Sequence, residues 1–304
     1  MHLRLSGLIA AVHTPLLDNG NVNLMVVERQ AKYLLSGGVS GAFVCGTTGE
    51  CHSLTVAERQ QLAARWISVA SKHMPIVVHV GHNCLANAQA LAAHAQQIGA
   101  IAIAAMAPSF FRPTTVDELI SYCAAIASHA PRLPFYYYDI PSMTGVNLPA
   151  SEFLDRGLEK IPTLNGVKFT NSDMAELDRC LAVRDQRYNV LFGFDELLLN
   201  ALQRGVHGAV GGTYNVAPQL YKSIIQSFQD GDLATAQSQQ ERAVKLVHAL
   251  AALGVIRAGK AAMKLVGMDM GQVRLPLCNL SADELATLRG QLDEIGLIAT
   301  PATV

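Results

Sequence analysis

The feature that most constrains the fold is an alternation of short apolar runs with longer segments of helical periodicity, which extends from Gly7 to about residue 228. The short runs are continuously apolar rather than alternating, as strands buried on both faces are. Such an alternation predicts repeated βα units on a parallel sheet. We expect eight strands, at residues 7–13, 41–45, 75–80, 101–105, 134–138, 165–169, 189–193 and 207–211.

Helix signals lie between these strands. Thr55 and Glu58 have the spacing of a capping box that opens a helix at residues 55–70. Asn83 is the expected cap of a helix that stops at Gly99, and another helix is expected at 195–205. Residues 232–253, 255–266 and 281–295 look helical with no strand between them. We therefore expect a barrel in residues 1–230 and C-terminal helices in residues 231–304, packed on the barrel as one structural unit.

Eight such units can form a closed barrel or a doubly wound open sheet. The open sheet that binds dinucleotides carries a glycine-rich fingerprint after its first strand. No GxGxxG stands there, and the GTTGE segment at residues 46–50 lacks the lysine and the glycine spacing of a P-loop. The predicted fold is therefore α/β, a (β/α)8 TIM barrel with a C-terminal helical appendix.

Composition limits the partners and the compartment. The formal net charge is −1 and Lys and Arg are scattered, so no nucleic-acid partner is expected. No run approaches the roughly 20 apolar residues of a membrane span, and the first twenty residues lack a small-residue cleavage site, so neither a membrane nor a signal peptide is expected. The six cysteines show no CxxC spacing, which favours reduced thiols in a cytoplasmic protein.

Active-site residues of a TIM barrel come from the carboxyl ends of the strands and the loops beyond them. We expect the polar and glycine residues at these ends to surround one cavity. They are Thr47, Thr48, Tyr138, Asp139, Lys168, Thr170, Asp195, Glu196, Gly211 and Gly212.

Lys168 is the most informative of them, because it interrupts an apolar strand where an unpaired ammonium is costly to bury. A desolvated lysine has a lowered pKa and becomes a nucleophile towards carbonyl groups. The alternative is a lysine that pairs with a carboxylate or extends from the strand end into solvent. The position of Lys168 and its neighbours favour the nucleophile.

Tyr138 ends the preceding strand and can relay protons beside Lys168, although a core aromatic is the alternative. Alternation places Tyr136 and Tyr138 on one face and Tyr137 on the other. The hydroxyl and N–H groups of Thr47 and Thr48 suit a carboxylate, with an ordinary glycine-rich turn as the alternative.

The histidines of the HVGH segment, His79 and His82, suggest a metal only weakly, because no third ligand stands at a recognisable spacing. We expect them to be hydrogen-bonded histidines and expect no metal.

With these residues, the chain resembles the dihydrodipicolinate synthase and N-acetylneuraminate lyase superfamily of class I aldolases. The resemblance covers most of the chain and rests on four motifs in order: GTTGE, YYDIP, GVKFT and GGTYN. It implies that Lys168 forms a Schiff base with pyruvate, that Tyr138 relays protons, and that Thr47 and Thr48 hold the carboxylate. It also implies a homotetramer without a metal or organic cofactor, whose only covalent intermediate is the Lys168 imine.

The lyase branch fits better than the synthase branch. Synthases usually carry an arginine after the IP of their YN(V/I)P segment, where this chain has Met143, and a tyrosine pair where this chain has Phe110 and Phe111. Neither the carboxylate clamp nor the proton relay of the synthases is therefore expected. GFDE, at residues 193–196, resembles the lyase segment whose acidic pair binds the sugar hydroxyls, with acids favourable to a helix N-terminus as the alternative.

The resemblance thus implies retro-aldol cleavage of sialic acid to pyruvate and N-acetylmannosamine. Thr170, Gly193, Asp195, Glu196, Gly211 and Gly212 would form the substrate pocket beside the catalytic Lys168, Tyr138 and Thr48. Many lyases have serine where this chain has Gly212. Another pyruvate-dependent aldolase or dehydratase, acting on a 2-keto-3-deoxy sugar acid or a 4-hydroxy-2-oxo acid, is the alternative, ahead of dihydrodipicolinate synthase. A silent barrel that binds a 2-oxo acid as a sensor is a third.

Overall fold

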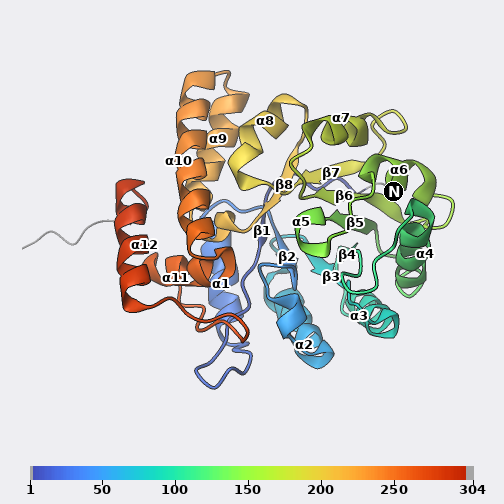
Figure 1. Cartoon of the computed structure of the whole chain (residues 1–304), viewed down its shortest axis with the longest axis horizontal. Helices are drawn as coiled ribbons and strands as arrows, with labels where there is room; N and C mark the ends of the chain where they lie inside the picture. The colour runs from blue at the N-terminus through green and yellow to red at the C-terminus, as the bar shows by residue number, and fades with distance from the viewer. Residues whose placement is uncertain (1–2, 299–304) are drawn as a thin grey trace, which may run out of the picture.

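A closed barrel of eight parallel strands forms the centre of the computed structural model, which describes residues 3–298 (Figure 1). Each strand pairs with the next, and β8 pairs with β1. The strands are β1 Gly7–Ala11, β2 Gly41–Val44, β3 Ile76–His79, β4 Ala102–Met106, β5 Phe135–Asp139, β6 Leu164–Phe169, β7 Asn189–Phe192 and β8 Gly208–Gly211. All eight lie within or beside the runs predicted from the sequence, so the TIM-barrel prediction is confirmed.

Helices surround this barrel and connect its strands. They are α1 Val26–Ser36, η1 Cys51–Ser53, α2 Val56–Ala70, α3 Leu85–Gln97, α4 Val116–Ala127, α5 Pro141–Thr144, α6 Ala150–Gly157, α7 Met174–Ala182, η2 Asp195–Leu197, α8 Leu198–Gln203, η3 Thr213–Asn215 and α9 Pro218–Gln229. The segment at 195–205 is therefore helical as expected, but it begins with the 3-10 turn η2 before α8.

Two of the predicted helix starts have different outcomes. The capping box of α2 is confirmed, because the Thr55 hydroxyl accepts from the Glu58 N–H (3.2 Å) and the Glu58 carboxylate accepts from the Thr55 N–H (2.8 Å). The cap at Asn83 is wrong, since α3 starts after Cys84 without a side-chain cap. The Asn83 side chain instead accepts from the Ser109 N–H (2.8 Å) and so ties the β3–α3 loop to the β4–α4 loop.

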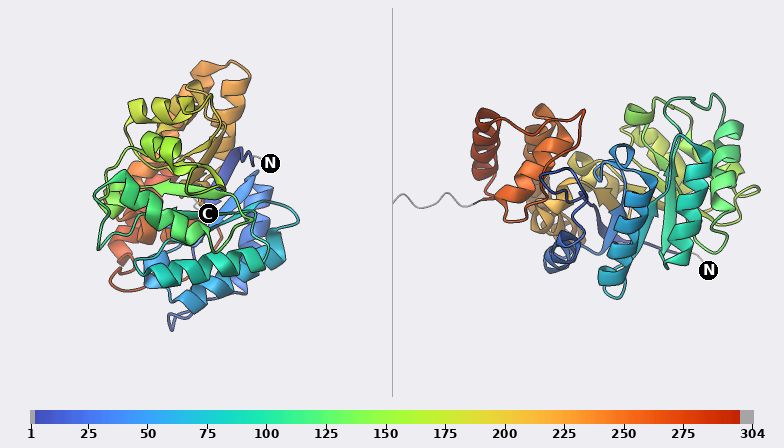
Figure 2. Two further views of the ribbon diagram at one scale, coloured as in Figure 1. Left: turned by 90° about the vertical axis from the view of Figure 1, so that its right-hand side faces the viewer. Right: turned by 90° about the horizontal axis from the view of Figure 1, so that it is seen from below.

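The C-terminal segment forms α10 Leu233–Ala252, α11 Val255–Leu265 and α12 Ala282–Glu294, which confirms the three expected helices. They gather on one side of the barrel, opposite α4 and α6 (Figures 1 and 2). Helix α10 packs along α9 and against η2, α11 and α12. The predicted boundary between barrel and C-terminal helices, at residue 230, falls in the α9–α10 turn, and this division stays a prediction. Residues 1–2 of the predicted barrel and 299–304 of the predicted C-terminal part lie outside the described residues.

Apolar side chains cover both faces of the strands: one cluster fills the inside of the barrel, and the other lies between the strands and the outer helices. Tyr136 and Tyr138 belong to the cluster inside the barrel, with Phe43, Val77 and Leu191, as the alternation predicts. Tyr137 belongs to the cluster between strands and outer helices. In the described part of the chain no single helix is long and apolar enough to span a membrane; α10 and α11 together pass on length and composition, but with a 117° bend between them.

Candidate active site

A cavity of about 450 Å³ opens at the carboxyl ends of the strands. Its lining brings together nine residues that the sequence singled out for chemistry. These are Thr47, Thr48, Tyr138, Lys168, Thr170, Gly193, Asp195, Glu196 and Gly212. Most residues that the strand-end rule selected therefore surround one space. The expectation is wrong for Asp139, which is not among the described lining residues and whose carboxylate accepts instead from the Asn171 side-chain amide (3.1 Å).

Lys168 lies at the base of this cavity, where β5 and β6 pair it directly with Tyr138. Its side chain is buried, and Nζ lies 3.6 Å from the centroid of the Tyr138 ring and 5.0 Å from that of Phe43. Burial lowers the pKa of Lys168 to about 7, although the charges of Asp195 and Cys51 act in the opposite direction. Lys168 forms no ion pair with any described residue, and because burial brings its pKa to about 7, much of this lysine is a neutral amine near pH 7.

The phenol of Tyr138 faces the same space. Its oxygen lies 3.1 Å from Thr47 Oγ1, which joins the end of β5 to the GTTGE loop. Burial raises the pKa of Tyr138 above its ordinary value, and the Thr47 hydrogen bond offsets this rise only in part. Tyr138 is therefore a protonated phenol at neutral pH, able to donate a proton beside the Lys168 amine.

The two acids after β7 have different environments. Asp195 is buried, and its Oδ2 accepts from the backbone N–H (2.9 Å) and the hydroxyl (2.5 Å) of Thr213. Glu196 is half-buried in the cavity wall. Burial raises the pKa of both carboxyl groups. Asp195 thus also fixes the turn after β8, while Glu196 faces the cavity from the same loop.

Three glycines shape the rim between β6, β7 and β8. A Cβ at Gly193 would lie 2.0 Å from Thr170 Oγ1, and one at Gly211 would lie 1.9 Å from Asp195 Oδ1. Gly211 is not among the described lining residues and packs behind Asp195. At Gly212 a Cβ would meet only Thr48, at 3.1 Å, and the backbone is ordinary for any residue (φ −77°).

Part of the wall comes from residues that the strand-end rule did not find. Helix α11 contributes Ile256, Arg257 and Gly259, and His13 follows β1. A Cβ at Gly259 would lie 2.8 Å from the His13 ring, so the glycine lets the helix approach. Burial, followed by the charge of Lys260, lowers the pKa of His13 to about 3. The only feature of the sequence that could have indicated the contact between α11 and His13 is Gly259, a glycine within a predicted helix.

The expected hydrogen-bonded histidines are confirmed. His79 Nδ1 lies 2.8 Å from the Cys45 carbonyl oxygen, and His82 Nδ1 accepts from the Cys84 N–H (2.9 Å). Within residues 3–298, no three His, Cys, Asp or Glu side chains converge in a way that could hold a metal ion. All six cysteines are free thiols.

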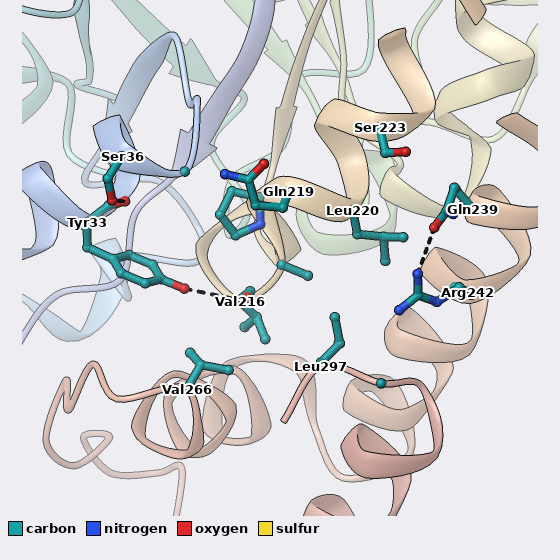
Figure 3. Close-up of a pocket in the computed structure, with 14 residues that line it drawn as sticks. Tyr33, Ser36, Val216, Gln219, Leu220, Ser223, Gln239, Arg242, Val266 and Leu297 are labelled. Carbon is teal, nitrogen blue, oxygen red and sulfur yellow. Dashed lines mark hydrogen bonds between the residues drawn. The ribbon is translucent and has the colours of Figure 1, made fainter. Parts of the chain in front are cut away.

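A second cavity, of about 540 Å³, lies among α1, α9, α10 and the residues after α12 (Figure 3). Arg242 donates there to Gln239 Oε1 (2.8 Å) and to the Ile295 carbonyl oxygen (2.7 Å). Its described lining residues include no amine, imidazole, thiol or carboxylate. The barrel-end cavity is therefore the better candidate for covalent chemistry.

Comparisons with known proteins agree on one family. The model of the dihydrodipicolinate synthetase family matches residues 4–295. N-acetylneuraminate lyase of Mus musculus is 41% identical over 304 residues, which cover 98% of this chain and 95% of that protein. The structure of Proteus mirabilis N-acetylneuraminate lyase has a TM-score of 0.94 and 38% identity and covers 97% of this chain and 100% of its own. That of the Aliivibrio salmonicida N-acetylneuraminate lyase (sialic acid aldolase) has a TM-score of 0.94 and 40% identity and covers 98% and 99%.

Proposed function

The chain belongs to the dihydrodipicolinate synthetase family, and within it we propose that it is an N-acetylneuraminate lyase, which cleaves sialic acid to pyruvate and N-acetylmannosamine. It is a carbon–carbon lyase of the class I aldolase type. The observation that carries the mechanism is a buried lysine, free of ion pairs with the described residues, at the base of the barrel-end cavity and beside a buried tyrosine.

The first step is imine formation. The neutral amine of Lys168 attacks the C2 ketone of the open-chain sugar, and Tyr138 donates a proton to the hydroxyl group that leaves as water. Hydroxyl and N–H groups of Thr47 and Thr48, with the Tyr138 phenol, hold the substrate carboxylate. The 3.1 Å contact between Thr47 and Tyr138 supports this shared site. The product is a protonated imine that can accept an electron pair.

Carbon–carbon cleavage follows. Tyr138, assisted by the substrate carboxylate, removes the proton of the C4 hydroxyl group. The C4 oxygen forms the aldehyde of N-acetylmannosamine, and the electrons of the C3–C4 bond move into the imine to give an enamine. Protonation at C3 and hydrolysis by water then release pyruvate and the free Lys168 amine.

The remaining lining residues would bind the sugar tail. Thr170, Glu196 and the backbone at Gly193 and Gly212 line the cavity, and Asp195 supports the turn that carries Gly212. Gly211 would act indirectly, because it leaves room for the Asp195 carboxylate. We propose that the enzyme needs no metal or organic cofactor and works as a cytoplasmic homotetramer. The free thiols support the compartment, and light scattering tests the oligomer.

The test is pyruvate release from N-acetylneuraminate by the wild-type protein and by Lys168→Ala. We expect release by the wild type and its loss in the variant. Lys264→Ala, which removes an exposed lysine of α11, is the matched control and should keep the wild-type rate. Borohydride added with pyruvate should add mass at Lys168 alone. Near wild-type release by Lys168→Ala contradicts the mechanism.

The absence of a hydroxyl group at position 212 favours one second candidate, an aldolase for an unbranched 2-keto-3-deoxy acid. Comparison of kcat/KM for the two substrates separates the candidates. A higher value for the 2-keto-3-deoxy acid, with the Lys168 adduct intact, selects the second.

A further inference from the structure

His79, at the end of β3, has no part in the proposed mechanism, yet it lies directly behind Tyr138. Its side chain is completely buried. The centroids of the His79 and Tyr138 rings are 5.8 Å apart, and the rings are nearly perpendicular (88°). Phe43 meets Tyr138 in a similar way, at 5.6 Å and 78°. Two aromatic contacts thus hold the ring whose phenol faces Lys168.

The contacts of His79 assign one tautomer. Nδ1 lies 2.8 Å from the Cys45 carbonyl oxygen, which can only accept, so Nδ1 carries the proton. Nε2 then accepts from the Met106 N–H, 3.5 Å away. Arg59 Nη2 lies 3.2 Å from Nδ1, but both groups are donors, and Nη2 donates instead to the His79 carbonyl oxygen (2.7 Å). The ring is neutral, with fixed donor and acceptor sides.

The Nδ1 hydrogen bond connects His79 to the start of the loop that carries Thr47 and Thr48. Cys45 has a left-handed backbone (φ +59°), which is strained for a residue with a side chain, and it directly precedes the GTTGE loop. The buried Arg59 of α2 fixes the other side, because Nη1 donates to the Gly81 carbonyl oxygen (2.9 Å) just after β3. One imidazole therefore connects the entry of the Thr47–Thr48 loop, the end of β3 and the Tyr138 ring.

We propose that His79 is a positioning residue: its neutral, Nδ1-protonated ring sets the Tyr138 phenol and the Thr47–Thr48 loop in register with the Lys168 amine. The inference rests on the proposed aldolase mechanism, since it assigns Tyr138 the proton transfers. It does not depend on the identity of the sugar, because pyruvate alone forms the imine and exchanges its methyl protons through the enamine.

The test compares His79→Asn with His79→Leu. Asn can place an amide N–H where Nδ1 stands, whereas Leu has a similar size and no donor. We measure exchange of the pyruvate methyl protons in D2O by NMR, and borohydride trapping at Lys168. His79→Leu should slow exchange by about tenfold or more, because small displacements of a catalytic group have such effects. Both variants should still be trapped, and His79→Asn should recover most of the exchange rate.

Equal exchange rates in the two variants overturn the proposal, as does a loss in His79→Leu that only follows its loss of folded protein by circular dichroism. If His79→Leu does not fold, His79→Gln replaces it, since its amide extends to the Nε2 position rather than to Nδ1. Exchange retained in Asn and lost in Gln supports the role of Nδ1, and equal rates contradict it. Failure to trap pyruvate on the wild-type protein would instead contradict the proposed function.

Discussion

At the scale of single residues, the burial of Lys168 favours a nucleophilic amine but costs stability. Its amine is buried against the rings of Tyr138 and Phe43, where a charge loses its hydration. The same desolvation lowers its pKa to about 7 and makes the amine nucleophilic. The folded state must therefore accept an unfavourable ammonium whenever the pH falls below this value.

We expect Lys168→Met to stabilise the fold, by about 1–4 kcal/mol at pH 6, as replacement of buried charges by apolar groups often does. The folded pKa, about 7, lies below the ordinary 10.5. Burial of the ammonium thus lowers the free energy of unfolding by its full amount below pH 7, and this loss becomes smaller as the pH rises from 7 to 10.5. Urea unfolding at pH 6 and pH 9 measures it, with the exposed Lys264→Met as control. A gain that grows with pH would contradict the burial argument.

At the scale of elements, the loop after β2 is joined to helix α11 by a buried ion pair. Lys260 Nζ lies 2.6 Å from Glu50 Oε1, and only 2% of each side chain is exposed. Glu50 Oε2 also accepts from the Arg274 N–H (3.0 Å), and Lys260 donates to the Gln272 carbonyl oxygen (2.5 Å). The last residue of GTTGE therefore ties the Thr47–Thr48 loop to the C-terminal part of the chain.

Lys260→Met should destabilise the protein by about 3–5 kcal/mol, because it leaves the Glu50 carboxylate buried without its ammonium. Adding Glu50→Gln removes that charge and should recover most of the loss. Chemical denaturation of the two single variants and the double variant measures the coupling. If the double variant is as unstable as the sum of the two single ones, the pair does not act as a unit.

The turn after β8 allows a matched comparison of adjacent glycines. Gly211→Ala would place its Cβ 1.9 Å from Asp195 Oδ1, so we expect a loss of about 1–3 kcal/mol in stability together with a loss of activity. Gly212→Ala meets only Thr48, at 3.1 Å, and should fold with near wild-type stability. Thermal unfolding and pyruvate release decide, and similar losses in both variants would show that the Asp195 contact is not the cause.

At the scale of the whole molecule, an apolar pair in the β4–α4 loop faces solvent in the single chain. Phe110 is 77% exposed and Phe111 86%, and the two rings pack edge to face with centroids 5.0 Å apart. Exposed aromatic residues that adjoin one another are typical of surfaces that contact a partner. They favour an interface between copies in the proposed tetramer.

Replacing both by serine should reduce the oligomer to a smaller species, because it removes the apolar contact area. Size-exclusion chromatography with light scattering measures the mass of the wild type and of Phe110→Ser/Phe111→Ser. Leu233→Ser, at a half-exposed apolar position of α10, controls for a general loss of surface apolarity and should leave the mass unchanged. An unchanged mass in the double variant would exclude this loop from the interface.

Much of the fold was predictable, because the signals are local. The eight strands are continuous apolar runs, and Lys168 is a charge within one of them, so their periodicity predicted both the barrel and a strand-end site. The capping box of α2 depends on residues three apart and was confirmed.

What only the tertiary structure decided depends on residues far apart in the chain. Asn83 bonds to Ser109 rather than to its own helix, and Gly259 lets α11 close the cavity against His13. Asp195 is oriented by Thr213, and the proton of His79 is assigned by the Cys45 carbonyl oxygen. The sequence by itself determined which segments are strands and helices and which residues end at the catalytic face, since these follow from local periodicity. The partners of each polar group follow from how those segments pack, which no local pattern encodes.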